Sequence, residues 1–380
     1  MSNNSTEKEN RFSPTICVTQ RCNLNCIYCY QNHDSKDMDF ETAKKCVDYI
    51  FDNVPKQFNA VEIDFIGGEP LVRFDLLKQI FNYVREKKVQ IPYLFFATTN
   101  GTLLDDEMKK WFTERKDYFV LGLSLDGTPE THNHNRSNSF SKIDIEFFKK
   151  NWPFQDVKMT LSEFSLEHLA ENIKYLHSLG YKSISGVNLF EGSFDWNQEK
   201  FIKMMIPQLE EIVDFYVDSD IEYKNQMLDK SLMICEAKRE KRKYCGIGDG
   251  TVFFDVDGIK RPCSFCSPMT FDEKTLEEMS KTDFTKEELF VDDDCFENCY
   301  IYPICPNCSG ANYLAEHSFK KRNRSKCRIQ KLISIFIADL QVRKILKNPD
   351  KYSDTEKFKI LEAAKKIKSA FLPEFSEYFE

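Results

Sequence analysis

Short apolar runs alternate with longer amphipathic stretches along the first half of the chain. The apolar runs are rich in β-branched and aromatic residues, which is typical of strands in a buried parallel sheet. We predict strands over residues 13–19, 60–66, 93–99, 118–125, 157–162 and 182–190. The amphipathic stretches repeat apolar residues at helical spacing. They predict helices over residues 39–54, 74–88, 105–115, 143–151 and 166–179.

This alternation describes six consecutive β–α units. Successive units of this kind form a parallel sheet with right-handed crossovers. The pattern is compatible with an open, doubly wound sheet and with a partial barrel. In both arrangements, functional loops follow the carboxyl ends of the strands.

The second half of the chain has a different character. Residues 197–240 have a helical pattern, whereas residues 245–327 are loop-rich, with a short strand at 251–256 and a turn at Asp257-Gly258. Such a loop-rich region has little apolar material, and bound metal is one way to hold its shape. The tail over 329–379 is predicted to be helical.

Composition and charge mainly exclude functions. Of the 380 residues, 41% are hydrophobic and 30% are charged, as in ordinary globular proteins. No apolar run reaches the roughly 18 residues of a membrane span, and the polar N-terminus lacks a secretory signal. We therefore expect a cytoplasmic protein without a membrane partner. The formal net charge of −8 disfavours a general nucleic-acid partner.

Two local charge runs are interpreted as solvated segments. A basic run covers residues 320–331, and we expect it to form the exposed face of a helix. An acidic stretch covers residues 272–294 and is expected to form a solvated insertion or linker. Neither run identifies a partner.

The 14 cysteines are clustered. Three lie at 22–29, three at 245–266 and five at 295–327. In a large chain without a secretory signal, clustered cysteines indicate metal binding or redox chemistry rather than disulfides. Cys17 lies in a strand-like run and Cys46 in a helical pattern, so both are predicted to be buried structural thiols. Cys235 also stands apart from the clusters.

The first cluster has the spacing Cys22-x3-Cys26-x2-Cys29 and directly follows the first predicted strand. Iron–sulfur clusters are usually held by four cysteine thiolates. Three ligands leave one iron open, and an open reducible iron can bind a substrate and pass an electron to it. A zinc site is the alternative, but no second pair of cysteines or histidines lies nearby.

This motif in this position resembles the radical S-adenosylmethionine (SAM) family, specifically the members with a C-terminal SPASM domain. The resemblance implies a [4Fe–4S] cluster whose open iron binds SAM through its methionine amino and carboxylate groups. It further implies reductive cleavage of SAM to a 5′-deoxyadenosyl radical, which abstracts hydrogen from a substrate. The cofactor carries the chemistry and the protein orients it.

The resemblance also implies a SAM pocket, made by motifs that mostly follow predicted strands. Gly67, Gly68 and Glu69 would bind the amino group, with Thr99 and Asn100 below the pocket. By the same resemblance, further contacts are made to the ribose by Ser124 and Asp126, to the carboxylate by Arg136, and to the adenine by Tyr28 and Leu189. The alternatives are an ordinary turn at Gly67, a surface ion pair for Arg136 and a core position for Leu189. His132 and His134 are expected to be structural or solvent-facing.

The later cysteines follow the order of a SPASM domain, although the outer spacings of the four-cysteine group are swapped. By resemblance, one auxiliary [4Fe–4S] cluster is held by Cys295, Cys299, Cys305 and Cys327. A second would be held by Cys245, Cys263 and Cys308, with Cys266, Cys235 or an open position as the fourth ligand. Cys266 is slightly favoured. Two structural zinc sites are the alternative.

The resulting fold is an α/β partial (β/α)6 TIM-like barrel followed by a cysteine-rich, loop-rich SPASM domain. The predicted divisions are a polar tail (1–12), the radical SAM barrel (13–200), a helical bridge (201–240), the SPASM domain (241–330) and a helical tail (331–380).

SPASM enzymes mostly modify peptides or proteins, so we expect a polypeptide substrate and an electron donor such as flavodoxin or ferredoxin. The first hypothesis is maturation of a ribosomally synthesised peptide by a thioether or carbon–carbon crosslink or by epimerisation. The alternative is oxidation of a sulfatase residue to formylglycine. Sulfatase-maturating enzymes carry a general-base Asp where this chain has Ser264, and a serine hydroxyl is a poor base.

Two further points bear on function. Only about a dozen residues precede the first predicted strand, which weakens the peptide-maturase hypothesis because many such enzymes carry a leader-binding domain there. A remote hypothesis is a non-catalytic iron–sulfur redox or sensor protein. No residue is assigned as a catalytic base.

Overall fold

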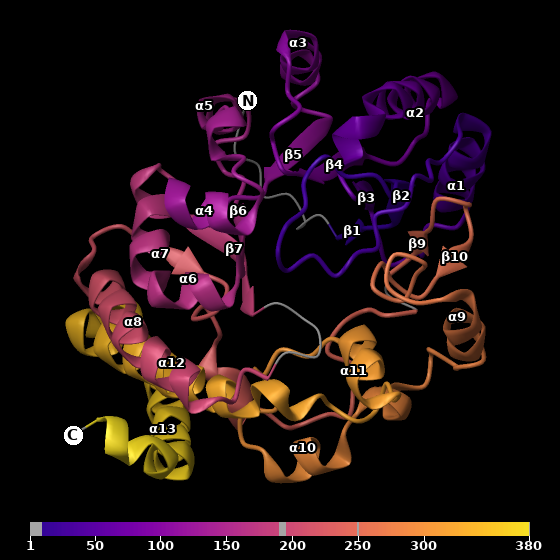
Figure 1. Cartoon of the computed structure of the whole chain (residues 1–380). Coiled ribbons are helices and arrows are strands. Elements are labelled where there is room, and N and C mark those ends of the chain that lie inside the picture. The colour runs from indigo at the N-terminus through magenta and orange to yellow at the C-terminus, as the bar shows by residue number, and fades with distance from the viewer. Residues whose placement is uncertain (1–9, 190–194, 249–250, 380) are drawn as a thin grey trace. The chain divides into compact units, whose positions relative to one another are not determined.

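A computed structural model describes residues 10–189, 195–248 and 251–379. The chain forms two compact units, each built from separate stretches of sequence. The first unit comprises residues 1–124, 139–155 and 246–285, and the second comprises residues 125–138, 156–245 and 286–380. Figure 1 shows their helices and strands along the chain.

The first unit is built on a mostly parallel sheet in the order β10-β9-β2-β3-β4-β5. Its strands are β2 (Thr15–Thr19), β3 (Ala60–Gly67), β4 (Tyr93–Thr99), β5 (Phe119–Leu123), β9 (Phe253–Phe254) and β10 (Lys260–Arg261). The strands β2 to β5 confirm the first four predicted strands. The predicted polar tail contains one short strand, β1 (Arg11–Phe12), which pairs with β3.

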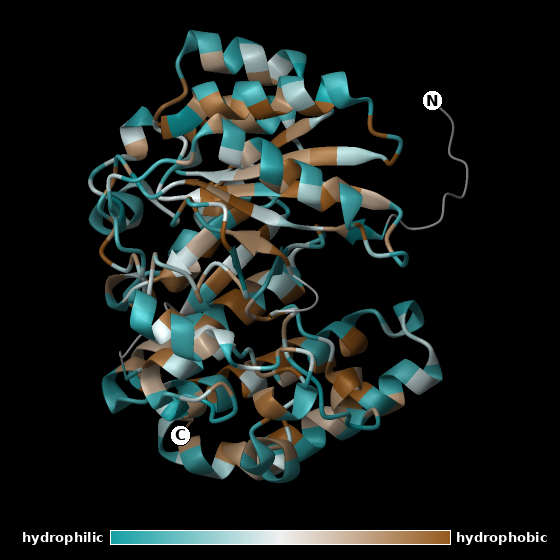
Figure 2. Ribbon diagram, turned by 90° about the vertical axis from the view of Figure 1, so that its right-hand side faces the viewer, coloured by the Kyte–Doolittle hydropathy of each residue, from teal (hydrophilic) through white to brown (hydrophobic). Residues whose placement is uncertain are grey.

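Four helices of this unit lie where amphipathic periodicity predicts them: α1 (Phe40–Asp52), α2 (Phe74–Lys87), α3 (Asp106–Glu114) and α5 (Ile145–Asn151). A further helix, α9 (Glu273–Ser280), was not predicted, and 3-10 turns are found at η1 (Pro70–Arg73) and η2 (Phe140–Lys142). Side chains fix several of their starts: Asp39 caps α1 and Asp105 caps α3 by accepting backbone N–H bonds. Apolar residues dominate the strands and alternate with polar ones along the helices (Figure 2).

An aromatic cluster forms the centre of the core of the first unit. Phe65, Phe95 and Phe119 come from three neighbouring strands, and their ring centroids lie 5.6–5.8 Å apart. All three side chains are fully buried. Since large apolar side chains contribute most to burial, this cluster stabilises the packing of the three neighbouring strands.

The second unit contains a three-stranded parallel sheet in the order β6-β7-β8, and it confirms the last two predicted strands. These strands are β6 (Val157–Leu161), β7 (Ser183–Leu189) and β8 (Lys224–Asn225). The helices are α4 (Pro129–Asn135), α6 (Glu163–Glu167), α7 (Leu169–Ser178), α8 (Glu199–Asp218), α10 (Asp293–Asn298), α11 (Ser309–Glu316), α12 (Cys327–Lys347) and α13 (Asp354–Phe371). The 3-10 turns are η3 (Leu232–Glu236), η4 (Glu287–Phe290), η5 (Arg324–Lys326), η6 (Pro349–Lys351) and η7 (Leu372–Tyr378). The long helix α12 packs against both α8 and α13, which explains its many buried positions.

The predicted helical bridge is only half helical. Helix α8 ends at Asp218, and its C-cap Ser219 has an extended backbone. The remaining residues up to 240 contain β8, the 3-10 turn η3 and irregular backbone. Short polar side chains such as Ser219 and Asp220 compete for backbone hydrogen bonds, which favours ending a helix there.

The compact units divide the chain differently from the predicted domains. Residues 246–285 lie inside the predicted SPASM domain, yet β9 pairs in parallel with β2 of the first sheet. Most of the acidic stretch 272–294 is also ordered and packed, because it contains α9 and η4 and buries Leu276, Met279 and Phe290. It is therefore not a simple solvated linker.

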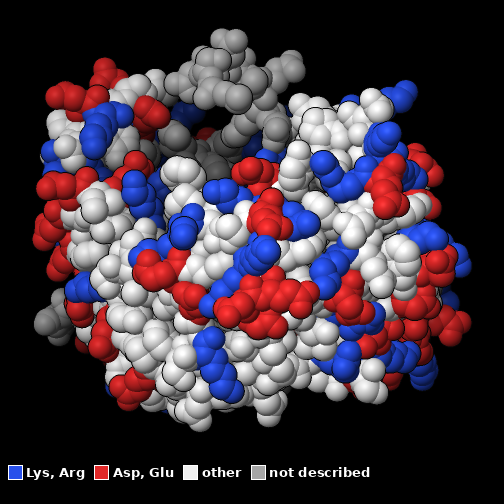
Figure 3. Space-filling view, turned by 90° about the horizontal axis from the view of Figure 1, so that it is seen from above, with Lys and Arg blue, Asp and Glu red and all other residues white. Residues whose placement is uncertain are grey.

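Acidic and basic side chains are interspersed on the face shown in Figure 3, and no single sign dominates it. This mixture agrees with the modest net charge of the chain. Within the described ranges, none of the helices combines the length and apolarity required to cross a bilayer.

Candidate functional site

The loop after β2 carries the first three cysteines. The Cys22 sulfur accepts a backbone N–H from Leu24 at 3.5 Å, and the backbone N–H of Cys29 donates to the Cys26 carbonyl at 3.1 Å. Cys22 and Cys26 are partly buried and Cys29 is exposed. Burial raises the pKa of the Cys22 thiol, and the Leu24 N–H partly opposes this rise. Partial exposure leaves the three sulfurs accessible to a cluster.

The Gly67-Gly68 turn lies directly against this cysteine loop. The backbone N–H of Gly68 donates to the Thr19 carbonyl at 3.1 Å. A Cβ atom on Gly68 would lie 2.3 Å from the Arg21 carbonyl oxygen, and one on Gly67 would lie 2.1 Å from that of Thr19. Two backbones can approach this closely only where side chains are absent. The glycines therefore set the position of the loop that carries Cys22.

Glu69 links the ends of two strands. Its carboxylate is 1% exposed and accepts hydrogen bonds from the Thr99 hydroxyl at 2.8 Å, the Asn100 backbone N–H at 2.7 Å and the Leu71 backbone N–H at 3.1 Å. Ser124 joins the same edge, since its backbone N–H donates to the Thr99 carbonyl at 3.0 Å. The structure thus brings together Glu69, Thr99, Asn100 and Ser124 at the carboxyl ends of β3, β4 and β5.

Asn100 extends this network to the cysteine loop. Its side-chain amide donates to the Asn23 side-chain oxygen at 2.9 Å, and the Asn23 amide donates to the Thr102 hydroxyl at 2.8 Å. Asn23 follows Cys22 directly. The glycine turn, the Glu69 network and the cysteine loop are therefore a single connected structure within the first unit.

Asp126 and Arg136 form a buried ion pair in the second unit. The Arg136 Nε lies 3.0 Å from the Asp126 carboxylate, which also accepts from the Thr160 backbone N–H at 3.1 Å and the Asn135 amide at 3.2 Å. Asp126 is 0% exposed and Arg136 is 8% exposed. Arg136 is thus not part of a surface ion pair, and Asp126 acts as the acceptor that orients it.

Two further predicted SAM contacts have less structural definition. Tyr28 is partly buried within the cysteine loop. Leu189 is the last residue of β7, but its side chain lies outside the described part of the structure. His132 and His134 are structural: His132 is fully buried, and the His134 ring stacks on Phe164 at 4.0 Å.

Two further thiols, those of Cys263 and Cys266, lie in the first unit near the cysteine loop. The Tyr30 ring, next to Cys29, stacks on Phe265 with centroids 4.9 Å apart. Phe265 lies between Cys263 and Cys266, and a hydrogen bond from Cys266 lowers the pKa of the Cys263 thiol. This contact supports the slight preference for Cys266 as a companion of Cys263.

Cys235 lies in a different environment, in the second unit. Burial raises the pKa of its thiol to about 12, and Cys299 is one of its electrostatic neighbours. Cys235 is therefore associated with the four-cysteine group rather than with Cys263. Cys17 and Cys46 are buried as predicted, at 1% and 3% exposure, and burial raises the pKa of each thiol to about 12.

Five of the later cysteines line one cavity of about 710 Å³ in the second unit, which we call the cysteine cavity. They are Cys295, Cys299, Cys305, Cys308 and Cys327. Helix α10 carries the first of them and is capped by the second, while Cys308 caps α11 and Cys327 begins α12. The four cysteines assigned by resemblance to one auxiliary cluster are therefore gathered around one space.

Cations of the basic run also line the cysteine cavity. They are Arg322, Arg324, Lys326, Arg328 and Lys331. The Arg324 Nη1 donates to the Cys295 sulfur at 2.7 Å, while its Nη2 lies 3.1 Å from Asp292 and Asp294 oxygens. The expectation that this run forms a solvated helix face is therefore wrong for these residues, because the chain folds them back onto the cysteines.

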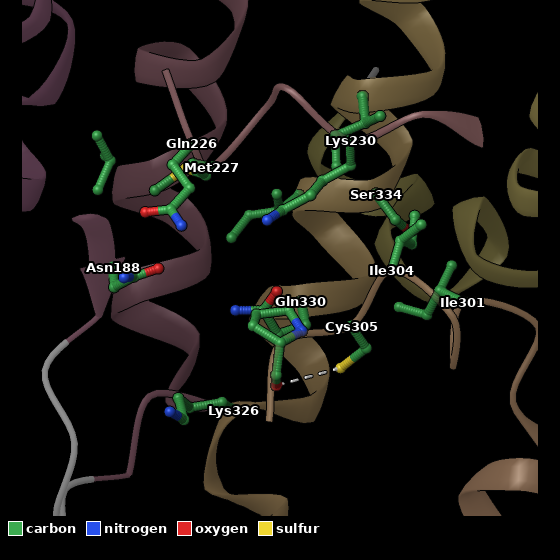
Figure 4. Close-up of a pocket in the computed structure, with 14 residues that line it drawn as sticks. Asn188, Gln226, Met227, Lys230, Ile301, Ile304, Cys305, Lys326, Gln330 and Ser334 are labelled. Carbon is green, nitrogen blue, oxygen red and sulfur yellow. Dashed lines mark hydrogen bonds between the residues drawn. The ribbon is translucent and has the colours of Figure 1, made fainter. Parts of the chain in front are cut away.

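A second, smaller cavity of about 40 Å³ adjoins Cys305. Figure 4 shows that Asn188, Gln226 and Lys230 face the cavity from one side, with Cys305 and Gln330 nearby. The Cys305 thiol contacts the Pro306 carbonyl at 3.9 Å. This space is small and is lined by both polar and apolar side chains, so it has room for a water molecule or two rather than for a larger ligand.

The donor set of the cysteine cavity fits an iron–sulfur cluster. Burial raises the pKa of Cys295 to about 12 and that of Cys305 to about 11, so the thiols need a metal or a positive charge to ionise. In the described ranges, no group of three or more His, Cys, Asp or Glu side chains converges on a single metal ion. A cluster has a different requirement, because each thiolate binds a separate iron.

Comparison with known proteins identifies the family. The model of the radical SAM superfamily matches residues 16–205, from β2 into α8. The chain belongs to the radical SAM superfamily. Proteins of this superfamily use a [4Fe–4S] cluster and SAM, so this chain is a radical SAM enzyme. The matched region begins just before Cys22, Cys26 and Cys29.

Three relatives show which radical SAM enzymes this chain is similar to. An uncharacterized Methanocaldococcus jannaschii protein is 31% identical over 252 residues, covering 62% of this chain and 79% of the relative. A cysteine-type anaerobic sulfatase-maturating enzyme of Clostridium perfringens is 25% identical over 321 residues, covering 75% and 84%. The subtilosin biosynthesis protein AlbA of Bacillus subtilis is 26% identical over 261 residues, covering 66% and 54%.

A solved structure supports the fold. The native anSMEcpe structure with bound AdoMet and the Kp18Cys peptide superposes with a TM-score of 0.68 at 21% identity. The match covers 90% of this chain and 100% of the other. At this identity the likeness shows a shared fold, which confirms the predicted α/β radical SAM architecture.

Proposed function

We propose that this radical SAM enzyme modifies a ribosomally synthesised peptide, by forming a thioether or carbon–carbon crosslink or by epimerisation. The observation that carries the proposal is the cysteine cavity, which gathers the later cysteines beyond the region matched by the family model. Relatives with peptide or protein substrates by name support it, among them AlbA. The peptide in the anSMEcpe structure shows that this fold can take a polypeptide.

The cysteine loop would hold the catalytic cluster through Cys22, Cys26 and Cys29. When bound, this cluster supplies the electron that cleaves SAM to a 5′-deoxyadenosyl radical. The protein contributes position: Gly67 and Gly68 fix the loop by close backbone contact. The Glu69 network with Thr99 and Asn100 then holds the strand ends around it.

The remaining SAM contacts are assigned by chemistry. Ser124 offers a hydroxyl suited to a ribose oxygen. Arg136 offers a guanidinium suited to the SAM carboxylate, and Asp126 holds that guanidinium through its Nε. Tyr28 and Leu189 offer apolar surface for the adenine. This assignment gives Asp126 a positioning role, since its carboxylate is fully buried.

Two auxiliary [4Fe–4S] clusters are part of the proposal. One would use Cys295, Cys299, Cys305 and Cys327 in the cysteine cavity. The other would use Cys245, Cys263, Cys266 and Cys308; the contact between Cys263 and Cys266 supports pairing those two. An electron donor such as flavodoxin or ferredoxin would supply the reducing electrons.

Sulfatase maturation is the second candidate, because the similarity to a sulfatase-maturating enzyme extends over 321 residues. Ser264 argues against it, since it occupies the position of the general-base Asp of those enzymes. Ser264 lies beside Cys263, and its carbonyl accepts the Ser267 hydroxyl at 2.6 Å. No carboxylate therefore stands at that position in the sequence.

The central test uses the fully reconstituted protein with dithionite and SAM under anaerobic conditions. We expect 5′-deoxyadenosine from the natural protein and none from Cys26→Ala, because two cysteines cannot hold the open cluster. Cys46→Ala is the matched control, since Cys46 is a buried thiol outside the clusters, and it should retain cleavage. Cleavage by Cys26→Ala would overturn the assignment, and no cleavage by fully loaded natural protein would favour a non-catalytic iron–sulfur protein.

The same assay identifies the substrate class. A candidate peptide encoded beside the gene should lose the mass of a hydrogen pair if it is crosslinked, or gain a deuterium in deuterated water if it is epimerised. A sulfatase-derived peptide is the comparison. Formylglycine on that peptide, with no change in the first, would support sulfatase maturation instead.

A further inference from the structure

Arg322 occupies an unusual position at the wall of the cysteine cavity. It is 7% exposed, and its guanidinium carbon lies 4.3 Å from the centre of the Tyr302 ring. Its Nε is buried and, within the described residues, has no hydrogen-bond partner. Among the described residues, no carboxylate lies within ion-pair distance of the Arg322 guanidinium, whereas Arg324 pairs with Asp292.

The carboxylate nearest in the network is already committed. Asp292 accepts the backbone N–H of Cys295 at 3.1 Å and that of Arg322 at 2.9 Å. Both of its oxygens also lie 3.1 Å from the Arg324 Nη2. Asp292 therefore pairs with the Arg324 side chain and accepts the Arg322 backbone N–H. The Arg322 guanidinium forms no ion pair with Asp292.

The positive charge of Arg322 also acts on the cysteines. Arg322 lines the cysteine cavity, and it is an electrostatic neighbour of Cys295, Cys299 and Cys305 as well as of Asp292. All three cysteines line the cysteine cavity. The guanidinium of Arg322, which forms no ion pair within the described residues, therefore lies beside the thiols that would hold an auxiliary cluster.

A buried cation requires a counter-charge. Moving an unpaired charge out of water is costly even after the protein relaxes around it. Arginine cannot escape this cost by losing its proton. A four-iron cluster with four cysteine thiolates is anionic, and it becomes more negative on reduction. It is the one ligand already implied for this cavity that supplies the missing charge.

We propose that Arg322 is the internal counter-ion of the auxiliary cluster held by Cys295, Cys299, Cys305 and Cys327. Its fixed charge stabilises the reduced cluster more than the oxidised one, and so raises the reduction potential of that cluster. The electron comes from the donor and stays on the cluster, and no proton transfer is needed because Arg322 remains charged. This inference rests on the proposed auxiliary cluster.

The test is a potentiometric titration of the full chain followed by electron paramagnetic resonance. A Cys26→Ala background removes the signal of the first cluster. In that background, Arg322→Gln should shift one auxiliary signal to a more negative midpoint potential. Arg322→Lys keeps the charge and should restore most of the shift. Lys321→Gln removes an exposed cation that pairs with Glu316, and it should leave the potential unchanged.

Iron content keeps the test decisive if the substitution affects assembly. Loss of about four irons in Arg322→Gln, one cluster's worth, with retention in Arg322→Lys, would also support a role for the charge. An unchanged potential at full iron content in Arg322→Gln would overturn the inference. So would equal loss in both variants, which would indicate packing. If Cys327→Ala removes no signal or iron from otherwise natural protein, the auxiliary cluster itself is absent.

Discussion

Single buried residues explain how the second unit orients Arg136, the residue proposed to bind the SAM carboxylate. Arg136 is oriented by Asp126, and His132 completes the group by accepting the Asp126 backbone N–H at its Nδ1, 3.4 Å away. Burial, with Arg136 as a second cause, lowers the pKa of His132 to about 4. A protonated His132 would place a second cation beside Arg136. The neutral ring is therefore part of what keeps Arg136 available for an anionic ligand.

This arrangement predicts a specific acid sensitivity. The unfolded chain protonates His132 near its ordinary pKa of 6.5, whereas the folded protein resists protonation until about pH 4. The contribution of His132 to stability is thus complete above pH 6.5 and is lost as the pH falls from there to 4. We expect the free energy of unfolding to fall by about 2 kcal/mol between pH 7.5 and pH 5 from this residue alone.

The measurement is denaturant unfolding across that pH range. His132→Asn should flatten the pH dependence, whatever its effect on stability at pH 7.5. His134→Asn changes a histidine of the same helix that stacks on Phe164, and it serves as the control. An unchanged slope in His132→Asn would contradict the buried neutral histidine.

At the scale of elements, the apolar periodicity of the sequence was sufficient to predict most strands and helices. The six predicted strands and the helices between them are present because each has a clear apolar repeat and enough length to show it. The strands β9 and β10 are only two residues each, and pairing β9 with β2 joins segments far apart in the chain. No local pattern specifies such a long-range contact. The sequence predicted a short strand at 251–256, which contains β9, and the turn at Gly258, which has φ +75°, but it did not predict the partner of that strand.

The basic run shows the same limit within the site. Residues 320–331 have the charges of an exposed helix, yet five of their cations line the cysteine cavity: Arg322, Arg324, Lys326, Arg328 and Lys331. Their position depends on Asp292 and on helix α10, which no spacing within the run reveals. Arg322 was missed for this reason. By contrast, Cys22, Cys26 and Cys29 could be proposed as cluster ligands because three close thiols after a strand form a specific motif.

The contact between the glycine turn and the cysteine loop predicts a sharp effect of Gly68→Ala. The added methyl would lie 2.3 Å from the Arg21 carbonyl oxygen, so one backbone must move. We expect a stability loss of about 1–3 kcal/mol. Because the loop that moves carries Cys22, we also expect loss of most of the iron of the first cluster and of SAM cleavage.

Gly122→Ala is the matched control. Its methyl would meet the far end of the Phe96 ring at 2.6 Å, away from the cysteine loop. It should reduce stability but keep the first cluster, as judged by iron content and 5′-deoxyadenosine formation. Equal iron loss in both variants would mean that general destabilisation, rather than the glycine contact, controls loading.

At the scale of the whole molecule, the two units differ in the interactions that stabilise each of them internally. The first has an extended sheet with a buried aromatic cluster at its centre. Part of the second, from Lys286 to Cys327, consists of short helices and loops around the cysteine cavity. The helices α8, α12 and α13 of that unit pack on each other and do not depend on the cavity alone. Cluster binding should therefore stabilise a defined part of the chain.

Iron removal should act on residues 286–327 far more than on β2 to β5. This region encloses about 710 Å³, and within the described residues the buried Arg322 Nε has no hydrogen-bond partner there. We expect backbone amides of α10 and α11 to exchange hydrogen at least about tenfold faster in chelator-treated protein, which corresponds to about 1.4 kcal/mol of local stability. Hydrogen exchange with mass spectrometry on anaerobic loaded and unloaded samples measures this. Cys327→Ala should reproduce the local effect, whereas Cys26→Ala should not. Uniform loss of protection across both units would contradict the prediction, because it would show that the clusters stabilise the molecule as a whole.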